Sequence, residues 1–231
     1  ANESYGLTTL KSMHVKHIKG EEAEGRHDVV FSFTGKSGKD WDITIEDDHL
    51  VDLILKTNRL GAKDADLFMY ISEAGNEVDL KAEHINQYIR ASSGMGFTAK
   101  NFRTWAATSR CAERLAFLAV PQTESAMKAW KRRVPSVESI DKMWTGGDWE
   151  PPATETGRNK VMLAVIDTVA SDLGNTRTVC RSSYIHPWFL DAWTEGRLAE
   201  AWAEYAEMRA MGNMTPGEST ALRILKAVVR G

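Results

Sequence analysis

The chain has 231 residues, of which 42% are hydrophobic and 26% are charged, and its formal net charge is −3. A disordered chain would have fewer apolar residues and a larger net charge. A membrane span would need about 18 or more consecutive apolar residues, and no window of the sequence provides them. The length allows one large domain or two small ones with a substantial core. The two cysteines, Cys111 and Cys180, are too few for a disulfide framework or a zinc site, so they favour buried thiols in a reducing cytoplasm.

The near-neutral charge balance argues against a nucleic-acid partner, because domains that bind nucleic acid are often strongly basic. The basic residues are nevertheless separated from the acidic ones along the chain, and such a chain can still present a basic face. The simplest interpretation of any single basic cluster is a solvated helix surface. There are three clusters: Lys11, Lys16 and Lys19; Lys100, Arg103, Arg110 and Arg114; and Lys128, Lys131, Arg132 and Arg133.

The first fifty residues have the alternation that is typical of a sheet. Apolar and polar residues alternate in two segments, which predicts two strands that each bury one face. The apolar positions are Val29, Phe31 and Phe33 in the first strand, and Trp41, Ile43 and Ile45 in the second. A glycine-rich turn over residues 35–39 joins them, and residues 13–18 form a candidate third strand.

Helical patterns fill most of the remaining chain. Three candidate helices begin at the capping residues Asp47, Asp79 and Thr98. An apolar stripe predicts a longer helix that begins near Arg158 and ends at Gly174. Further helices are expected over residues 176–184, from Pro187, over residues 197–211 and from Thr215-Pro216.

Residues 121–157 differ in composition from the helical segments on either side. They contain four prolines and the Gly146-Gly147 pair, which indicates an insertion or a long surface loop. The fold class expected from the whole pattern is α+β and mainly helical, with a small antiparallel three-stranded sheet attached to a helical body. We expect one domain over residues 1–210 and a C-terminal helical tail over residues 211–231.

Common catalytic motifs are missing from the sequence. No histidine or cysteine pair has the spacing of a metal site, and there is no dinucleotide-binding glycine motif. Gly35-Lys36-Ser37 is not a phosphate-binding loop, because Val30 stands where that loop needs a glycine and strands flank the match. What remains is a set of cations and one tyrosine, Tyr184.

Four stretches of sequence, taken together, resemble a known family. They are residues 5–10 (YGLTTL), 33–39 (FTGKSGK), 97–105 (FTAKNFRTW), and 173–176 (LGNT) with 184–187 (YIHP). In these stretches the chain resembles the catalytic domain of a type IB DNA topoisomerase, of the bacterial branch related to the poxvirus enzymes. The stretches follow the family's order and cover roughly residues 4–200.

The resemblance implies an enzyme that relaxes supercoiled duplex DNA without ATP or another cofactor. Tyr184 would attack a backbone phosphate, forming a 3′-phosphotyrosyl link and releasing a 5′-hydroxyl. Arg103 would stabilise the transition state, because a guanidinium contacts two phosphate oxygens at once. Lys36 matches the general acid that protonates the leaving oxygen. Asn175 matches an amide donor that holds a non-bridging oxygen but transfers no proton.

The resemblance also implies how the protein meets its DNA. Lys100, one turn before Arg103, is expected to reach the same phosphate region, and Lys39 and Lys11 are candidate phosphate contacts. The expected partner is supercoiled duplex DNA, with no metal and no membrane. The protein is expected to be a monomer in the cytoplasm, associated with the nucleoid.

One departure from the family pattern concerns the start of the chain. The resemblance places a further catalytic arginine, and a small N-terminal DNA-clamping domain, upstream of Tyr5, where this chain has only residues 1–4. We therefore expect a fragment with impaired relaxation, since loss of one preorganised donor typically slows a reaction by about 10²–10³.

Three alternatives stay open from the sequence. A tyrosine recombinase shares the chemistry, but its motifs usually read His-x-x-Arg and Gly-His, where this chain has Lys100-x-x-Arg103 and Gly174-Asn175. A non-catalytic DNA-binding module would contain the same basic clusters. An unrelated helical enzyme would carry those clusters only as surface.

Overall fold

The computed structural model describes residues 4–19, 27–35, 38–58 and 62–230. They form two compact units, residues 1–99 and residues 100–231, each with a hydrophobic core of its own. Across these described ranges, none of the helices combines the length and apolarity that crossing a membrane requires.

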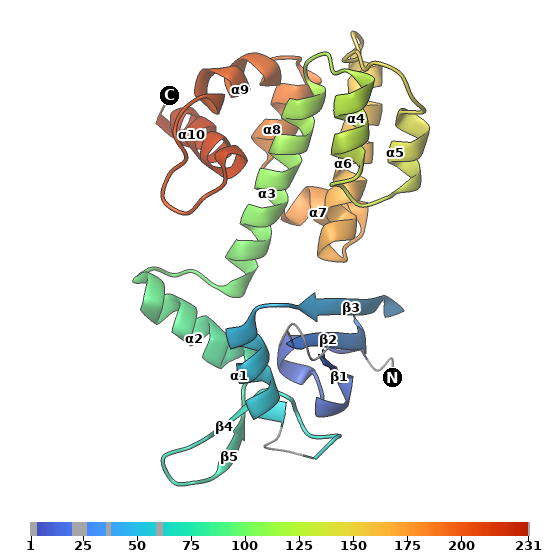
Figure 1. The fold of residues 1–231 in the computed structure, drawn as a ribbon. Helices are drawn as coiled ribbons and strands as arrows, with labels where there is room; N and C mark the ends of the chain where they lie inside the picture. Colours follow the sequence, from blue (N-terminus) through green and yellow to red (C-terminus); the bar gives the residue numbers. More distant parts are fainter. Residues whose placement is uncertain (1–3, 20–26, 36–37, 59–61, 231) are drawn as a thin grey trace. The chain divides into compact units, whose positions relative to one another are not determined.

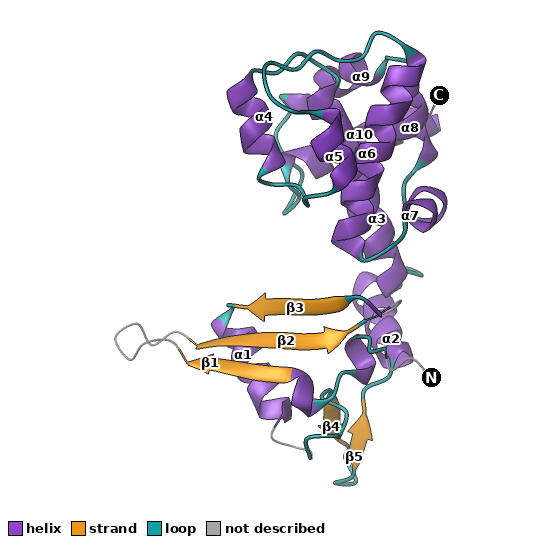
Figure 2. Ribbon diagram, turned by 90° about the vertical axis from the view of Figure 1, so that its right-hand side faces the viewer, coloured by secondary structure: helices purple, strands orange, loops and turns teal. Residues whose placement is uncertain are grey.

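The first unit contains the predicted three-stranded antiparallel sheet, in the order β1-β2-β3 (Figure 2). Val29 and Phe31 of β2 are buried, and their core includes Val51 and Ile54 of helix α1. The expected alternation is confirmed in β2, whereas in β3 Ile43 is exposed and Trp41 and Ile45 are only partly buried. The bounds are β1 Val15–Lys19, β2 His27–Thr34, β3 Asp40–Ile45 and α1 Asp48–Asn58.

Helix α1 begins as the sequence predicts. The backbone N–H of Leu50 donates to the side chain of Asp47 at 2.9 Å, which makes Asp47 the N-terminal cap. The buried residues of α1 are Val51 and Ile54, whereas Leu50 and Leu53 are exposed.

A second, two-stranded sheet was not expected from the sequence. Strands β4 (Met69–Ile71) and β5 (Glu77–Asp79) pair through a tight turn at Gly75, whose φ of 79° suits glycine. Asp79, the predicted helix cap, therefore belongs to a strand. Helix α2 (Ala82–Ser93) begins instead after Lys81, whose N–H donates to the ring of His84 at 3.2 Å.

The second unit is entirely helical in its described part (Figure 1). Helix α6 has the predicted cap at its end, because Gly174 adopts the left-handed conformation with φ 63°. The Thr176 hydroxyl caps α7 and Pro187 starts α8, as expected, whereas α9 is shorter than residues 197–211. The bounds are α3 Ala99–Leu118, α4 Glu124–Lys131, α5 Glu138–Met143, α6 Glu155–Leu173, α7 Arg177–Ser183, α8 Pro187–Thr194, α9 Leu198–Ala206 and α10 Pro216–Arg230.

Residues 121–157 are not the long surface loop that their composition indicated. They form α4 and α5, and they contribute buried side chains to the main core of the second unit. The indole of Trp149 donates to the carbonyl of Leu118 at 2.9 Å, which ties the segment to the end of α3. The prolines and glycines mark the ends of short helices, while the tryptophans bury against the helical body. The buried residues are Met127, Trp130, Ile140, Trp144 and Trp149.

Candidate active site

The predicted site residues are divided between the two units. Lys11 and Lys39 belong to residues 1–99, whereas Lys100, Arg103, Asn175 and Tyr184 belong to residues 100–231. Lys36, the predicted general acid, lies outside the described residues.

Arg103 and Tyr184 lie together although they are far apart in the sequence. Arg103 is near the start of α3, where its guanidinium donates to the carbonyl of Leu173 at 2.8 Å. The same group lies over the ring of Tyr184, 5.6 Å from the ring centroid. That distance is within the range of a cation–π contact. The fold thus brings the predicted cation to the predicted nucleophile.

Asn175 lies in the loop between α6 and α7, two residues after Leu173. Its backbone N–H donates to Ala170 at 2.8 Å, and Gly174 provides the left-handed turn that this loop needs. The side-chain Nδ2 is buried, and no acceptor for it exists among the residues that the structure describes. An unpaired amide donor is destabilising unless an acceptor reaches it. A phosphate oxygen would be such an acceptor.

The sequence analysis missed Thr108, which holds the backbone of the nucleophile. Its buried hydroxyl donates to the carbonyl of Tyr184 and accepts the N–H of His186, each at 3.0 Å. The two backbone groups that Thr108 contacts belong to Tyr184 and to the residue two positions after it. The available signal was a threonine next to Ala107 and one turn before Cys111, on the apolar face of α3.

Cys180 is one turn before Tyr184, but it is not a second nucleophile. Burial, and after it the charge of Asp172, raises the pKa of its thiol to about 11, although the charge of Arg103 opposes the change. The thiol is therefore protonated at neutral pH. Burial also raises the pKa of Cys111, and both cysteines are free, buried thiols as expected.

Comparisons with known proteins decide between the families that use such an arrangement. The sequence model of a family described as "Eukaryotic DNA topoisomerase I, catalytic core" matches residues 1–201. The chain belongs to the type IB DNA topoisomerases. A DNA topoisomerase 1B of Acanthamoeba polyphaga mimivirus is 36% identical over 110 residues. That segment is 46% of this chain and 30% of the viral protein, so the chain spans well under two thirds of this relative.

The type IB topoisomerase family accounts for the fold class predicted from the sequence, a mainly helical chain with a small antiparallel sheet. It also favours a topoisomerase over a recombinase or an unrelated helical enzyme. The expected bacterial, poxvirus-like branch gains no support, because the matched family is described as eukaryotic and the matched relative is viral.

Many cations of this topoisomerase chain are already paired. On α3, Arg114 contacts Asp172 at 2.7 Å and Arg110 contacts the same oxygen at 3.4 Å. In the third basic cluster, Lys128 pairs with Glu124 at 2.8 Å and Lys131 with Asp141 at 2.7 Å. These contacts reduce the charge that either cluster offers to DNA. Lys100 differs, because it is exposed and forms no ion pair within the described ranges.

The two lysines of the first unit are held by neighbours. Lys11 forms an ion pair with Asp66, and its hydrogen bond to that carboxylate raises the pKa of the ammonium group. The ammonium of Lys39 lies over the ring of Trp41, 4.2 Å from the centroid, on an exposed part of the chain. Lys11 therefore has to exchange a carboxylate for a phosphate to contact DNA.

Proposed function

We propose that this protein relaxes supercoiled duplex DNA by cleaving and resealing one strand, with Tyr184 as the nucleophile. The observation that carries the proposal is the guanidinium of Arg103 over the ring of Tyr184, at 5.6 Å from the ring centroid. A cation beside the nucleophile is what attack on a phosphate anion requires, because negative charge builds on the phosphate oxygens in the transition state.

In the cleavage step, the phenolic oxygen of Tyr184 forms a bond to phosphorus and loses its proton to solvent water. The bond between phosphorus and the 5′-oxygen breaks, and Lys36 gives a proton to that oxygen. The products are a 3′-phosphotyrosyl link and a free 5′-hydroxyl. The strand then swivels, and the hydroxyl attacks the link to reverse the step. No ATP is needed, because the covalent link conserves the energy of the broken bond.

The remaining residues of the proposed site bind the phosphate and the DNA. Arg103 contacts two oxygens through its planar fork, and Asn175 donates its unpaired amide to a non-bridging oxygen. Lys100, Lys39 and Lys11 contact neighbouring phosphates. We further propose that the protein belongs to the poxvirus-like branch and acts as a monomer in the nucleoid. Size-exclusion chromatography tests the monomer, and localisation of a tagged protein tests the association with the nucleoid.

Covalent trapping tests the nucleophile directly. A suicide duplex, which loses a short leaving strand after cleavage, is incubated with the parent protein and with Tyr184→Phe. The parent should form a DNA adduct that survives denaturant, and the variant should form none. Tyr88→Phe is the control, since Tyr88 is an exposed tyrosine of the first unit, and it should trap like the parent. A parental level of adduct in Tyr184→Phe would reject Tyr184 as the nucleophile, and no adduct with either protein would favour a non-catalytic DNA-binding module.

A plasmid assay separates the topoisomerase from the recombinase. Relaxation of supercoiled plasmids that share no defined recombination site, without strand exchange, is expected for the topoisomerase. Strand exchange confined to one site would instead indicate a recombinase.

A further inference from the structure

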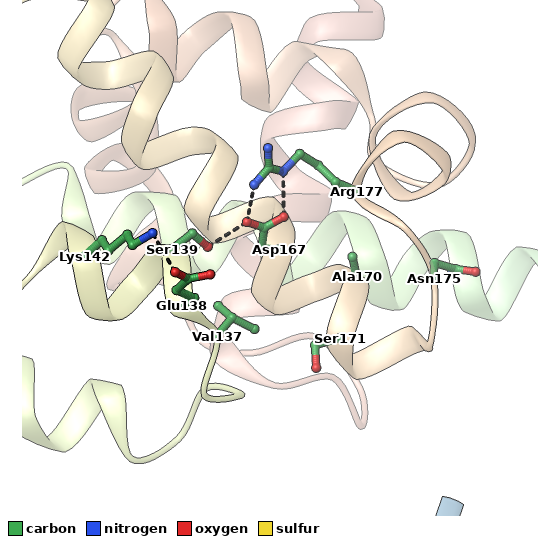
Figure 3. Close-up of a pocket in the computed structure, with 9 residues that line it drawn as sticks. All are labelled: Val137, Glu138, Ser139, Lys142, Asp167, Ala170, Ser171, Asn175 and Arg177. Carbon is green, nitrogen blue, oxygen red and sulfur yellow. Dashed lines mark hydrogen bonds and ion pairs between the residues drawn. The ribbon is translucent and has the colours of Figure 1, made fainter. Parts of the chain in front are cut away.

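A partly buried carboxylate connects three helices of the second unit next to the proposed site. Asp167 of α6 accepts hydrogen bonds from Arg177 at the start of α7 and from Ser139 of α5 (Figure 3). The distances are 2.6 Å to Arg177 Nε and 2.6 Å to Ser139 Oγ, and a second N–H of Arg177 donates to the other carboxylate oxygen. Such a bidentate pair fixes orientation as well as distance.

This cluster borders a cavity of about 460 Å³ that Asn175 also lines. In Figure 3, Asn175 follows the end of α6 and points away from the Asp167–Arg177 pair. The cluster thus shares a cavity with Asn175, while its hydrogen bonds connect Asp167 to Arg177 and Ser139. Its place suggests that it acts on the helix that bears the nucleophile.

Helix α7 has only seven residues. Isolated helices shorter than about 12–15 residues are marginal in water, so the position of α7 depends on its tertiary contacts. Arg177 and Cys180 lie on one face of this helix, three residues apart, and Tyr184 follows the helix as its C-cap residue. Cys180 is buried in the core. The contact at Arg177 therefore sets the rotation of the helix that ends at Tyr184.

The two ends of α7 are held by different partners. Thr108 of α3 holds the backbone at Tyr184, whereas Asp167 holds Arg177 at the other end. The pair is ionised at neutral pH: burial raises the pKa of Asp167, but the hydrogen bonds from Arg177 and Ser139 and the charge of Arg177 outweigh it and lower the pKa. The same hydrogen bond raises the pKa of Arg177.

We propose that Asp167 is a positioning residue for the cleavage reaction: by clamping Arg177 it sets the rotation of α7 and with it the line of attack of Tyr184. Ser139 supports the clamp from the 121–157 segment, which gives that segment a role in the reaction. This inference rests on the proposed function of Tyr184. In this proposal Asp167 acts through Arg177 and not on the DNA, so its effect should fall on the cleavage rate and not on DNA affinity.

The test is single-turnover cleavage of a suicide duplex at saturating DNA by the full-length protein. Asp167→Asn should lower the rate constant by about 10- to 100-fold, as expected when a reacting group is misplaced. DNA affinity, measured in a Tyr184→Phe background, should change by less than about threefold. Asp167→Glu keeps a charged acceptor for Arg177 and should recover part of the rate.

Two controls separate positioning from general destabilisation. Lys142→Met removes a cation that lines the same cavity but pairs with Glu138 on its own helix, so its rate should stay within about twofold of the parent. Val169→Ala in the α6 core should lower the melting temperature at least as much as Asp167→Asn, yet cleave faster than it.

Each possible failure has a distinct signature. An Asp167→Asn rate within about twofold of the parent, while Tyr184→Phe abolishes trapping, would overturn the positioning role alone. The positioning role is also overturned if Val169→Ala lowers the melting temperature as much as Asp167→Asn does and slows cleavage by the same factor. Trapping by Tyr184→Phe would instead overturn the proposed function, and this inference with it.

Discussion

Arg103 donates a hydrogen bond of 2.8 Å to the backbone carbonyl of Leu173, which is the last residue of α6. The carbonyls at a helix C-terminus carry partial negative charge, so this position attracts and orients a guanidinium. The contact occupies one side of Arg103 and holds it over the ring of Tyr184. The loop that carries Asn175 begins at the same carbonyl. One hydrogen bond therefore sets the relative positions of the cation, the amide and the nucleophile.

The first prediction concerns the planar fork of Arg103. In Arg103→Lys, a single ammonium replaces a group that binds two phosphate oxygens, and transition-state stabilisation is lost. We expect single-turnover cleavage to slow by about 10²–10³. Because Arg103 is exposed, the melting temperature should not change. Arg90→Lys, at an exposed arginine of α2, is the control and should cleave at the parental rate. Unimpaired cleavage by Arg103→Lys would contradict the assignment.

The second prediction concerns Thr108. In Thr108→Val, the carbonyl of Tyr184 and the N–H of His186 lose their common partner in a buried place. We expect the free energy of unfolding to fall by about 1–3 kcal/mol, measured in urea by tryptophan fluorescence. Thr108→Ser keeps the hydroxyl and should retain most of the stability.

The control for Thr108 is a neighbouring threonine of the same helix. The hydroxyl of Thr104 donates only to Lys100 within α3, at 3.1 Å. Thr104→Val should therefore change stability by less than about 0.5 kcal/mol. If both valine variants lose the same stability, the link from α3 to the tyrosine contributes nothing of its own.

Local signals in the sequence were sufficient to predict several helix ends. Some signals act within one turn of the chain, and the helix ends that they predict agree with the structure. They are the left-handed turn at Gly174, the capping hydroxyl of Thr176 and the fixed backbone of Pro187. Asp79 failed as a cap because the pairing of β4 with β5 outweighed its capping tendency. Strands β4 and β5 have three residues each, which is too few for an alternation of apolar and polar residues to be recognised in the sequence.

Contacts between distant segments could not be predicted in the same way. The resemblance placed Arg103 and Tyr184 in one site, and the structure brings them together. The resemblance gave no indication that Asp172 pairs with arginines of α3, or that Asp167 forms an ion pair with Arg177. Such pairs depend on how α3, α6 and α7 pack, and every charged residue in the sequence has many possible partners.

The third prediction concerns pH and the buried His14. Its ring nitrogen Nδ1 accepts the backbone N–H of Lys11 at 2.9 Å, which requires the neutral imidazole. Burial, together with the charge of Lys11, lowers the pKa of His14 from 6.5. The unfolded chain then binds more protons than the folded unit as pH falls. Stability is fully present above pH 6.5 and should decrease as pH falls through that value toward the lower folded-state pKa.

The variant His14→Asn isolates this effect. The asparagine carbonyl can accept the same N–H but does not titrate in this range. The free energy of unfolding in guanidinium is measured at about pH 7.5 and about pH 5.5, with hydrogen exchange in β2 and β3 as the probe. This free energy should depend less on pH in the variant than in the parent. Identical pH dependence in the two proteins would mean that His14 does not contribute.

The fourth prediction contrasts an unpaired cation with a paired one. Lys100 is exposed at the start of α3 and, among the described residues, has no carboxylate partner, whereas Lys131 pairs with Asp141 at 2.7 Å. A lysine that neutralises one DNA phosphate contributes about 0.9 to the slope of log K against log salt concentration. Lys100→Gln should therefore reduce this slope by about one, measured by fluorescence anisotropy in the Tyr184→Phe background. Lys131→Gln should leave it unchanged, because Asp141 already balances that charge. Equal changes in the two variants would show that the ion pair opens on DNA, and no change in Lys100→Gln would remove Lys100 from the interface.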